Sequence, residues 1–387
     1  MRVLNCFLDN RFGGPQKRAC EVASRLKSRG VETLFLLNEK SKTSKPVHGF
    51  VVYSIKHAQI LSVEKSLLEL LRFLFFVPIN IQKTLSIIKK EEIDIVHVNG
   101  LVNLLPAVAA KMLHTKVIWH LNDTSTPRAI KAFFLPFVRL CSNAVAIAAR
   151  QVGRYCFRRN EGLWKKADIL YPPVDMEAFN PERIDRKKIH RLKEEFGASE
   201  QDLLIGTVGN INPAKGYEYF IQAAQRIASK ANNVKFVIVG TELETQKPYS
   251  RKIRNLIKHY NLQDKFVLAG FREEIPEILC LFDVFVLASV SEACPIVVLE
   301  AMAMKVPIVA TNVGGVPEQV MDGQTGHVVE PRNPAAIATA VLALLQTPKA
   351  QLEEMVEKGR RRAERIFSLD RIAGQHRQLY QRLVTGN

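Results

Sequence analysis

The sequence is 387 residues long, which is enough for two domains with separate hydrophobic cores. Its hydrophobic content of 47% and charged content of 24% are ordinary for a soluble globular protein, and its uncharged apolar runs are too short to span a bilayer as a helix. The six cysteines form no C-x-x-C pair, which argues against a structural zinc site or a disulfide framework.

Positive charge is concentrated in the first half of the chain. The formal net charge is +17, and residues 1–175 hold 27 Lys and Arg against 13 Asp and Glu, whereas the remainder holds 28 against 25. This asymmetry predicts an anionic partner such as a phosphorylated substrate, an anionic membrane surface or nucleic acid. Nucleic acid is disfavoured, because the chain has no zinc-finger spacing, no basic helix with heptads and no aromatic pattern of an RNA-binding sheet.

The chain begins with a strand, helix, strand pattern. Residues 2–8 and 31–37 have the apolar character of buried strands, and residues 15–29 have the single inward face of a helix. In the loop between them, Gly13 and Gly14 either let the backbone approach a ligand phosphate or sugar, or simply form a tight turn. The G-x-G-x-x-G fingerprint is absent, which disfavours an NAD dehydrogenase. No secretory signal peptide is expected, because Met1 leads directly into the first strand.

Residues 63–90 form an unusually apolar segment. It is crowded with Leu and Phe, Pro78 ends or kinks it, and Lys83, Lys89 and Lys90 follow. One interpretation is a surface that lies on an anionic bilayer. The other, which we favour, is a helix buried against the first sheet, because apolar helices more often belong to a core.

Two further strands of the first domain end in polar residues. Residues 93–98 include His97 near their end, and His120 follows residues 116–119. Ligands of open α/β sheets bind at the carboxyl ends of the strands, so both histidines are candidate site residues. The alternative is a structural histidine with satisfied hydrogen bonds.

A basic segment and a linker follow. Residues 150–166 are dense in Arg and Lys, and they form either a solvated helix face or a patch for a phosphate-bearing acceptor. Residues 171–175 contain two prolines, which exclude a helix and indicate an interdomain linker.

The second half of the chain repeats the alternation of strands and helices. This alternation predicts a second doubly wound domain with strands at 203–209, 234–239, 266–269, 284–288, 307–310 and 327–329. Lys215 and Gly216 lie between the first of these strands and a helix at 217–229, so Lys215 is either a point charge for a diphosphate or an ordinary surface lysine. Helices at 334–346, 349–366 and 368–384 close the chain.

The stretch from 291 to 315 is the most informative one. Glu292 lies in a turn, Pro295 is placed where a first helical position tolerates proline, and Glu300 lies inside an apolar helix at 296–304. The open N-terminus of such a helix, at the carboxyl end of a parallel strand, suits a phosphate. We hypothesise that Glu292 faces the reacting part of a ligand and that Glu300 bonds hydroxyls such as those of a ribose. The alternative is one solvated turn glutamate and one glutamate at the edge of a core helix.

These residues resemble the signature of the retaining nucleotide-sugar glycosyltransferases with the GT-B fold, the large Glu-x7-Glu family of family 4 type, in its bacterial surface-polysaccharide branch. The pattern reads here Glu292, Glu300 and then Gly-Gly-Val-Pro-Glu at 314–318. The family's lysine is present as Lys215, whereas Asn210 replaces its arginine. Three further residues depart from the family pattern: Ala293 and Cys294 replace Gly-Phe, and Lys305 replaces a glycine that ends the helix. Because residues 293–294 differ, the identity of the donor sugar cannot be transferred from the family to this chain.

The resemblance implies an α/β protein with the GT-B fold, which is two doubly wound Rossmann-like domains with a cleft between them. Residues 1–172 together with the C-terminal helix 368–387 would form the N-terminal, acceptor-side domain. Residues 173–367 would form the C-terminal domain that binds the nucleotide sugar.

The resemblance also implies roles for individual residues. His120 and Glu292 would be catalytic, with His120 orienting the sugar or acceptor and Glu292 bonding donor-sugar hydroxyls. Lys215 and the N-terminus of the helix near Ile296 would stabilise the leaving diphosphate by preorganised charge. The residues expected to bind the donor are Gly13, Gly14, Asn210, Lys215, Gly216, Phe271, Arg272, Cys294, Pro295, Ile296, Val297 and Glu300. No Asp-x-Asp occurs, so we expect no metal and no cofactor beyond the nucleotide sugar as co-substrate.

The function expected on this basis is retaining transfer of a sugar from a nucleotide diphosphate sugar to a hydroxyl of a saccharide or lipid-linked saccharide. Two alternatives stay open: a GT-B-fold nucleotide-sugar epimerase, and a non-catalytic scaffold subunit that binds the donor. The expected partners are the donor, the acceptor and an anionic membrane surface, without nucleic acid. The expected location is the cytoplasm, with the inner face of the plasma membrane as a peripheral site.

Overall fold

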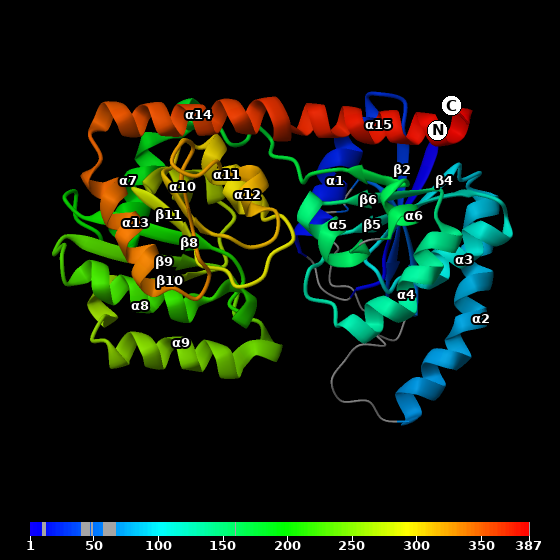
Figure 1. Cartoon of the computed structure of the whole chain (residues 1–387), viewed down its shortest axis with the longest axis horizontal. Helices are drawn as coiled ribbons and strands as arrows, with labels where there is room; N and C mark the ends of the chain where they lie inside the picture. Colours follow the sequence, from blue (N-terminus) through cyan, green and yellow to red (C-terminus); the bar gives the residue numbers. More distant parts are fainter. Residues whose placement is uncertain (10–12, 40–46, 48, 57–66, 159, 387) are drawn as a thin grey trace. The chain divides into compact units, whose positions relative to one another are not determined.

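The buried apolar runs of the sequence become the strands of two parallel sheets (Figure 1). The structure, a computed structural model, describes residues 1–9, 13–39, 47, 49–56, 67–158 and 160–386, without the side chains of 67–74. The chain divides into two units, the first made of residues 1–173 and 369–387 and the second of residues 174–368. Both boundaries fall one residue later than the predicted ones, 172/173 and 367/368.

The first unit contains a seven-stranded sheet whose neighbouring strands are all parallel. Most of its strands are buried on both faces, which explains why they are nearly continuous apolar runs and do not alternate with polar residues. In spatial order the strands are β3 (Val51–Ile55), β2 (Glu32–Asn38), β1 (Arg2–Phe7), β4 (Ile95–Asn99), β5 (Lys116–Leu121), β6 (Ala144–Ile147) and β7 (Ala167–Ile169).

Helices flank this sheet, and the last helix of the chain is one of them. The helices of the unit are α1 (Gly14–Lys27), α2 (Leu67–Lys90), α3 (Leu104–Met112), α4 (Arg128–Cys141), α5 (Arg150–Phe157), α6 (Glu161–Trp164) and α15 (Leu369–Thr385). Helix α15 lies against α1, and its Ile372 and Leu379 share a core cluster with Val22 and Leu26 of α1. The C-terminal helix is therefore a structural part of the first unit.

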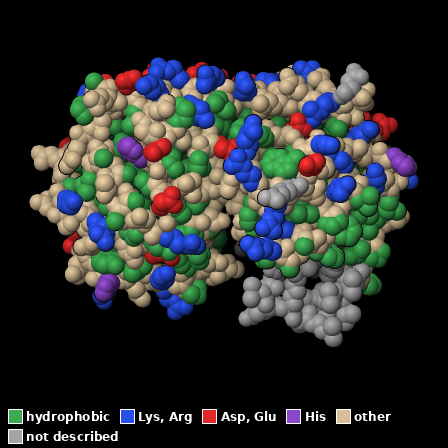
Figure 2. Space-filling view, viewed as in Figure 1, with side chains coloured by type: hydrophobic (Ala, Val, Ile, Leu, Met, Phe, Trp, Pro, Cys, Tyr) green, Lys and Arg blue, Asp and Glu red, His purple; other side chains and the backbone are tan. Residues whose placement is uncertain are grey.

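The apolar segment predicted at 63–90 overlaps α2, and its residues 63–66 lie outside the described residues. The helix continues through Pro78, so the prediction that this proline could end it is wrong. Thr84 and Ile88 are buried and α2 packs against α3, whereas Phe75 is 67% exposed. Figure 2 shows hydrophobic side chains at the surface of this unit. No helix in the described ranges is long and apolar enough to cross a membrane.

The second unit contains a six-stranded parallel sheet covered by helices. In spatial order its strands are β10 (Phe266–Gly270), β9 (Val234–Val239), β8 (Leu203–Val208), β11 (Val284–Leu287), β12 (Ile308–Thr311) and β13 (His327–Val329). Its α-helices are α7 (Arg186–Glu195), α8 (Tyr217–Ala228), α9 (Lys247–His259), α10 (Ile275–Leu281), α11 (Ile296–Ala303), α12 (Val316–Gln319), α13 (Pro334–Gln346) and α14 (Lys349–Phe367). The core between sheet and helices is built around Phe220, Phe236 and Ile253.

Both sheets are doubly wound, which confirms the predicted α/β class with two Rossmann-like domains. The strand order reverses direction between β1 and β4 in the first unit and between β8 and β11 in the second. At such a switch point the loops that leave two neighbouring strands diverge, and the space between them is the usual binding site of an open α/β sheet. The predicted site residues can now be placed relative to these two points.

Candidate functional site

At the switch point of the second unit, the loop after β8 holds Lys215 in a tight turn. The side chain of Asn212 accepts a hydrogen bond of 3.0 Å from the backbone N–H of Ala214 and so starts a short 3-10 helix that ends at Lys215. Gly216 follows with φ of 61°, and a Cβ there would lie 2.2 Å from the carbonyl oxygen of Ala288. Only glycine fits both the left-handed backbone and this close approach, and α8 begins at the next residue.

Lys215 is paired with Glu292, which lies in the loop after β11. Its Nζ is 2.7 Å from Glu292 Oε1, and Ser289 Oγ donates to the same carboxylate oxygen at 2.8 Å. The two side chains are 22% and 14% exposed, so the pair lies near the surface but is largely shielded from water. Two residues that the sequence singled out separately thus form one charged group at the switch point.

The loops after β11 and β12 are held together by backbone contacts. Gly314 has φ of 52°, and a Cβ there would lie 1.9 Å from the carbonyl oxygen of Glu292. The N–H of Gly315 donates to the carbonyl of Ala293 at 2.7 Å, and Thr311 Oγ1 donates to the carbonyl of Ser289 at 2.6 Å. The Gly-Gly pair therefore lets the two loops touch, and this contact positions Glu292.

Helix α11 begins directly after this loop. Pro295 is its N-cap and Ile296 its first residue, so the expectation that proline would occupy a first helical position is off by one. The Pro295 carbonyl accepts a bond of 3.0 Å from Gln319 Nε2. Glu300 lies inside the helix and is buried, with 5% of its surface exposed, whereas Cys294, Ile296 and Val297 are half-buried.

The other predicted donor residues of this unit have different surroundings. Asn210 is half-buried, and its carbonyl accepts a bond of 3.0 Å from Asn212 Nδ2. Phe271 is 68% exposed. The guanidinium of Arg272 forms ion pairs with Glu195 and Glu274, which raise the pKa of the arginine further. In this arrangement the Arg272 side chain is held by carboxylates of its own unit.

At the switch point of the first unit, the described part of the loop after β1 leads into α1. Residues 10–12 lie outside the described residues, and Gly13 is the N-cap of α1, with its N–H donating to Gln16 Oε1 at 3.1 Å. Gly14 is the first helical residue and is exposed. The glycine pair is therefore the start of a helix at this switch point.

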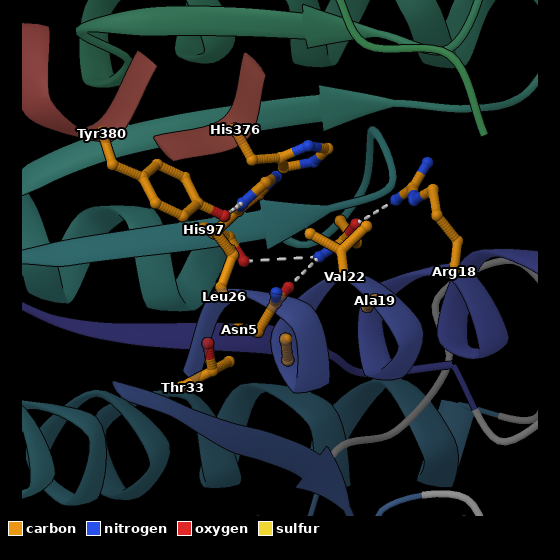
Figure 3. Close-up of a pocket in the computed structure, with 11 residues that line it drawn as sticks. Asn5, Arg18, Ala19, Val22, Leu26, Thr33, His97, His376 and Tyr380 are labelled. Carbon is orange, nitrogen blue, oxygen red and sulfur yellow. Dashed lines mark hydrogen bonds between the residues drawn. The ribbon is translucent and has the colours of Figure 1, made fainter. Parts of the chain in front are cut away.

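Next to α1 lies a buried polar cluster, to which β1, α1, β4 and α15 contribute the side chains drawn in Figure 3 and β5 contributes His120, which is not drawn. Arg18, only 3% exposed, donates to His120 Nε2 at 3.0 Å and to Asn99 Oδ1 at 2.8 Å. His120 Nδ1 lies 3.1 Å from His97 Nε2, and His97 Nδ1 lies 2.9 Å from Tyr380 Oη. The cluster therefore runs from an arginine through two histidines to a tyrosine of the last helix.

Arg18 determines the direction of the hydrogen bonds in this chain. Arginine can only donate, so Nε2 of His120 is the acceptor and Nδ1 carries the proton of the neutral ring. Nδ1–H then donates to His97 Nε2, and His97 Nδ1–H donates to Tyr380 Oη. Burial holds the pKa of both histidines well below its usual value, and the nearby positive charge of Arg18 lowers it further. Both rings are therefore neutral, each in a single tautomer.

This cluster is a packed structure and has no room for a sugar. The cavity that its residues line measures about 10 Å³, roughly the space of one water molecule. His120 is completely buried, and both of its ring nitrogens are engaged. To orient a ligand, as predicted, His120 would have to break one of these two ring hydrogen bonds. The geometry therefore favours a role in positioning the neighbouring side chains.

Sequence reasoning missed Arg18 and Tyr380 as members of this cluster. One signal was available for Arg18, because it precedes Ala19 and lies four residues before Val22, both on the inward face of the predicted helix. Among the described residues, no group of three or more His, Cys, Asp or Glu side chains is arranged to hold a metal ion.

Comparisons with known protein families match both halves of the chain. The family described as Glycosyltransferase Family 4 matches residues 12–178, and the family described as Glycosyl transferases group 1 matches residues 188–362. The boundary between the two matches falls near the start of the second unit.

Curated relatives align with about half of this chain, and the aligned part is also about half of the length of each relative. Alpha-D-kanosaminyltransferase of Streptomyces kanamyceticus is 34% identical over 194 residues, 49% of this chain and 48% of its own. The putative colanic acid biosynthesis glycosyltransferase WcaL of Escherichia coli K12 is 26% identical over 246 residues, 58% of this chain and 59% of its own.

Solved structures share the fold over the whole chain. A glycosyltransferase from Rickettsia africae has a TM-score of 0.84 at 20% identity and covers 100% of this chain and 99% of its own. HepE from Anabaena, solved in complex with UDP, has a TM-score of 0.83 at 19% identity and covers 98% of this chain and 100% of its own. At these identities the likeness concerns the fold.

Proposed function

Because the chain belongs to the GT-B glycosyltransferases of group 1 and family 4, we propose that it transfers a sugar from a nucleotide diphosphate sugar to a hydroxyl group. The acceptor that we propose is a saccharide or a lipid-linked saccharide. Support for the donor class comes from HepE, whose solved structures hold UDP or UDP-glucose, and support for the acceptor class comes from the resemblance to the Glu-x7-Glu family.

The observation that carries the proposal is the Lys215–Glu292 pair at the switch point of the second unit. A diphosphate is bound by a cation and by the N–H groups at the start of a helix. Lys215 supplies the cation from the loop after β8, and the neighbouring loop after β11 leads into the start of α11. The glycines at 216 and 314 fix these loops in place before any ligand binds. The site is therefore preorganised for charge on a leaving group.

We propose separate roles for the charged residues of this site. Lys215 binds the diphosphate and exchanges at least part of its contact with Glu292 for a phosphate oxygen. Glu292, once released, accepts hydrogen bonds from hydroxyls of the donor sugar. The N-terminus of α11 at Ile296 and Val297 faces phosphate, and Glu300 binds the ribose hydroxyls. These positive groups would carry the diphosphate without a metal ion.

In the reaction that we propose, the oxygen of the acceptor hydroxyl forms a bond to the anomeric carbon of the donor sugar. The bond from that carbon to the diphosphate oxygen breaks, and the nucleoside diphosphate leaves with the electron pair. The hydroxyl proton is taken up by the departing diphosphate. Retention of the anomeric configuration is part of the proposal and is supported by the resemblance to the Glu-x7-Glu family.

The test begins with a thermal-shift screen of nucleoside diphosphates and is followed by incubation with the matching nucleotide sugars. We expect one base to raise the melting temperature, and we expect release of that nucleoside diphosphate to depend on an added saccharide acceptor. Conversion of the donor to another sugar in the absence of acceptor would establish an epimerase instead. Binding of a nucleotide sugar without any turnover over a broad acceptor panel would establish a donor-binding scaffold.

A further inference from the structure

Helices α12 and α14 pack against α11, whose N-terminus belongs to the proposed diphosphate site (Figure 1). Helix α12 follows the Gly-Gly pair at 314–315 and buries Val316 and Gln319. The side chain of Gln319 is completely buried, and its Nε2 donates a bond of 3.0 Å to the carbonyl of Pro295. A buried amide of α12 therefore contacts the peptide at the start of α11.

This peptide is the one that carries the N–H of Ile296. The carbonyl of Pro295 and the N–H of Ile296 belong to one planar trans unit, in which the two groups point in opposite directions. A bond that fixes the carbonyl therefore also fixes the direction of the N–H. The same bond polarises the peptide and makes its N–H a stronger donor.

The stability of the fold does not account for the amide of Gln319. Pro295 is the N-cap of α11, and the carbonyl of an N-cap residue already accepts the first intrahelical bond. The other amide atom of Gln319, Oε1, is buried and has no hydrogen-bond partner among the described residues. Leaving a buried acceptor unsatisfied costs at least as much stability as a neutral hydrogen bond usually contributes. An apolar side chain of similar size would avoid that cost, so the amide indicates a role at the site.

Arg362 of α14 keeps α12 in place. Helix α12 has four residues, too few for a helix that is stable alone. Arg362 Nε donates to the Gln319 carbonyl at 2.8 Å, and Arg362 Nη2 donates to the Glu318 carbonyl at 2.7 Å. These carbonyls lie at the C-terminal end of α12, where intrahelical partners are lacking and a cation is favourable. At the other end, the N–H of Gly315 donates to the carbonyl of Ala293 at 2.7 Å.

Helix α14 also holds the far end of α11. Arg360 Nη1 donates to the carbonyl of Ala303, the last residue of α11. Just beyond that end, Lys305 Nζ lies 2.7 Å from Glu357 Oε2 of α14. Helix α14 therefore fixes the C-terminal end of α11 directly and its N-terminal end through α12.

We infer that Gln319 is a positioning residue for the leaving diphosphate, and that Arg362 supports it. Gln319 orients the N–H of Ile296 toward a phosphate oxygen and strengthens it as a donor. Arg362 keeps the amide within reach of the Pro295 carbonyl. Neither side chain contacts the phosphate itself. The inference rests on the proposed function, because it requires a phosphate at the start of α11.

The test is isothermal titration of the full chain with whichever of ADP, CDP, GDP, UDP and dTDP gives the largest thermal shift. Gln319→Leu leaves the Ile296 N–H present but misdirected, so it should weaken diphosphate binding about tenfold, near the lower end for a bond to a charged group. Affinity for the corresponding nucleoside, which has no phosphate, should stay within about twofold. The melting temperature should change little, because the lost bond and the removed unpartnered oxygen offset each other.

Gln319→Glu gives a second readout that a purely structural role would not move. A protonated carboxyl group at this position can donate to the Pro295 carbonyl, whereas a carboxylate cannot. Burial favours the protonated form. The ratio of the Kd of this variant to that of the wild type should therefore fall toward one as pH is lowered from about 8 to about 5.

Arg362→Lys tests whether the arginine acts through Gln319. Lysine cannot reproduce the fork that bonds two carbonyls, so this change should weaken diphosphate binding about threefold. In the Gln319→Leu background it should have no further effect, since the two substitutions break the same connection. Gln222→Leu is the matched control, because it makes the same change at a half-buried position of α8 and should leave binding unaltered.

The outcomes separate this inference from the proposed function. Wild-type affinity in Gln319→Leu would overturn the inference and leave the proposed function standing. Equal weakening of nucleoside and diphosphate binding would also overturn it, because the whole site would then be disturbed. A Kd ratio of Gln319→Glu that does not vary with pH would have the same consequence. Failure of the wild type to bind any of the five diphosphates would overturn the proposed function and this inference together.

Discussion

The Lys215–Glu292 pair leads to a prediction in which two substitutions have opposite effects on one ligand. If the diphosphate competes with Glu292 for Lys215, then Glu292→Gln frees the cation and Lys215→Gln removes it. The pair is 2.7 Å long and its side chains are 22% and 14% exposed, so we assign it about 1 kcal/mol, the upper end for pairs near a surface. Glu292→Gln should therefore tighten binding of the nucleoside diphosphate about fivefold.

Lys215→Gln should act in the other direction. A hydrogen bond from an ammonium group to a phosphate contributes about 1.5–3 kcal/mol, so its loss should weaken diphosphate binding roughly 10- to 150-fold. It also leaves the carboxylate of Glu292 next to the phosphates. Both substitutions should lower kcat of transfer by about 100-fold or more, because Lys215→Gln removes the cation that stabilises the leaving diphosphate and Glu292→Gln removes the carboxylate that bonds hydroxyls of the donor sugar.

Isothermal titration with the nucleoside diphosphate selected by the thermal-shift screen measures these affinities directly. Lys230→Gln is the matched control, since it removes an exposed lysine of the same unit and should change neither affinity nor turnover. Equal weakening of diphosphate binding by Glu292→Gln and Lys215→Gln would refute the idea of competition. Unchanged binding in both variants would refute the placement of the diphosphate.

Three further predictions concern stability and donor affinity. In urea denaturation, Gly216→Ala should lower the free energy of unfolding of the second unit by about 3 kcal/mol or more, and Gly323→Ala should lower it by about 1 kcal/mol. Both glycines have a left-handed backbone, but of the two only Gly216 would push a Cβ into a backbone carbonyl. Equal losses of stability would contradict this explanation. His376 is a buried residue of α15 that lines the polar cluster of the first unit. Burial lowers its pKa from 6.5 to about 4, so the unfolded chain binds the proton first, and the free energy of unfolding should fall by about 3 kcal/mol as pH drops from 6.5 to 4. The slope should be shallower in His376→Leu, and a wild-type slope in that variant would exclude His376 as the cause. Glu300→Ala should raise the KM for the donor at least tenfold with kcat within about threefold, measured by initial rates, and a loss confined to kcat would remove its role in ribose binding.

The predictions at 234–239 and 327–329 coincide with β9 and β13, because both strands are rich in β-branched residues and each is bounded by polar or glycine residues. The missed strands have other compositions: β6 is half alanine, β7 contains alanine and aspartate in its three residues, and much of β3 is exposed. Such strands are formed by pairing with a neighbour in the sheet, which local pattern does not encode.

The candidate site was predictable residue by residue but not as an arrangement. Lys215 and Glu292 were both identified, yet they are 77 residues apart, and their contact arises because β8 and β11 are neighbours at the switch point. Arg18 was not identified because a charged residue on a helix is expected to face solvent. Its partners His120 and Asn99 lie 102 and 81 residues further along the chain, and they come together because β4 and β5 are neighbours in the sheet.

The two switch points show why a cation at such a place is not sufficient for a donor site. Arg18 is 3% exposed and donates to the side chains of His120 and Asn99 around a cavity of about 10 Å³, so a ligand could reach it only by opening the core. Lys215 is 22% exposed, and its partner Glu292 lies on a loop that needs only to move a carboxylate aside. A lysine that is paired with a partly buried carboxylate near the surface can exchange this partner for a phosphate, whereas an arginine that hydrogen-bonds a buried histidine and a buried amide cannot do so without loss of packing. We therefore expect the diphosphate to bind in the second unit, whereas the buried cluster of the first unit links β4, β5 and α15 through its side-chain hydrogen bonds.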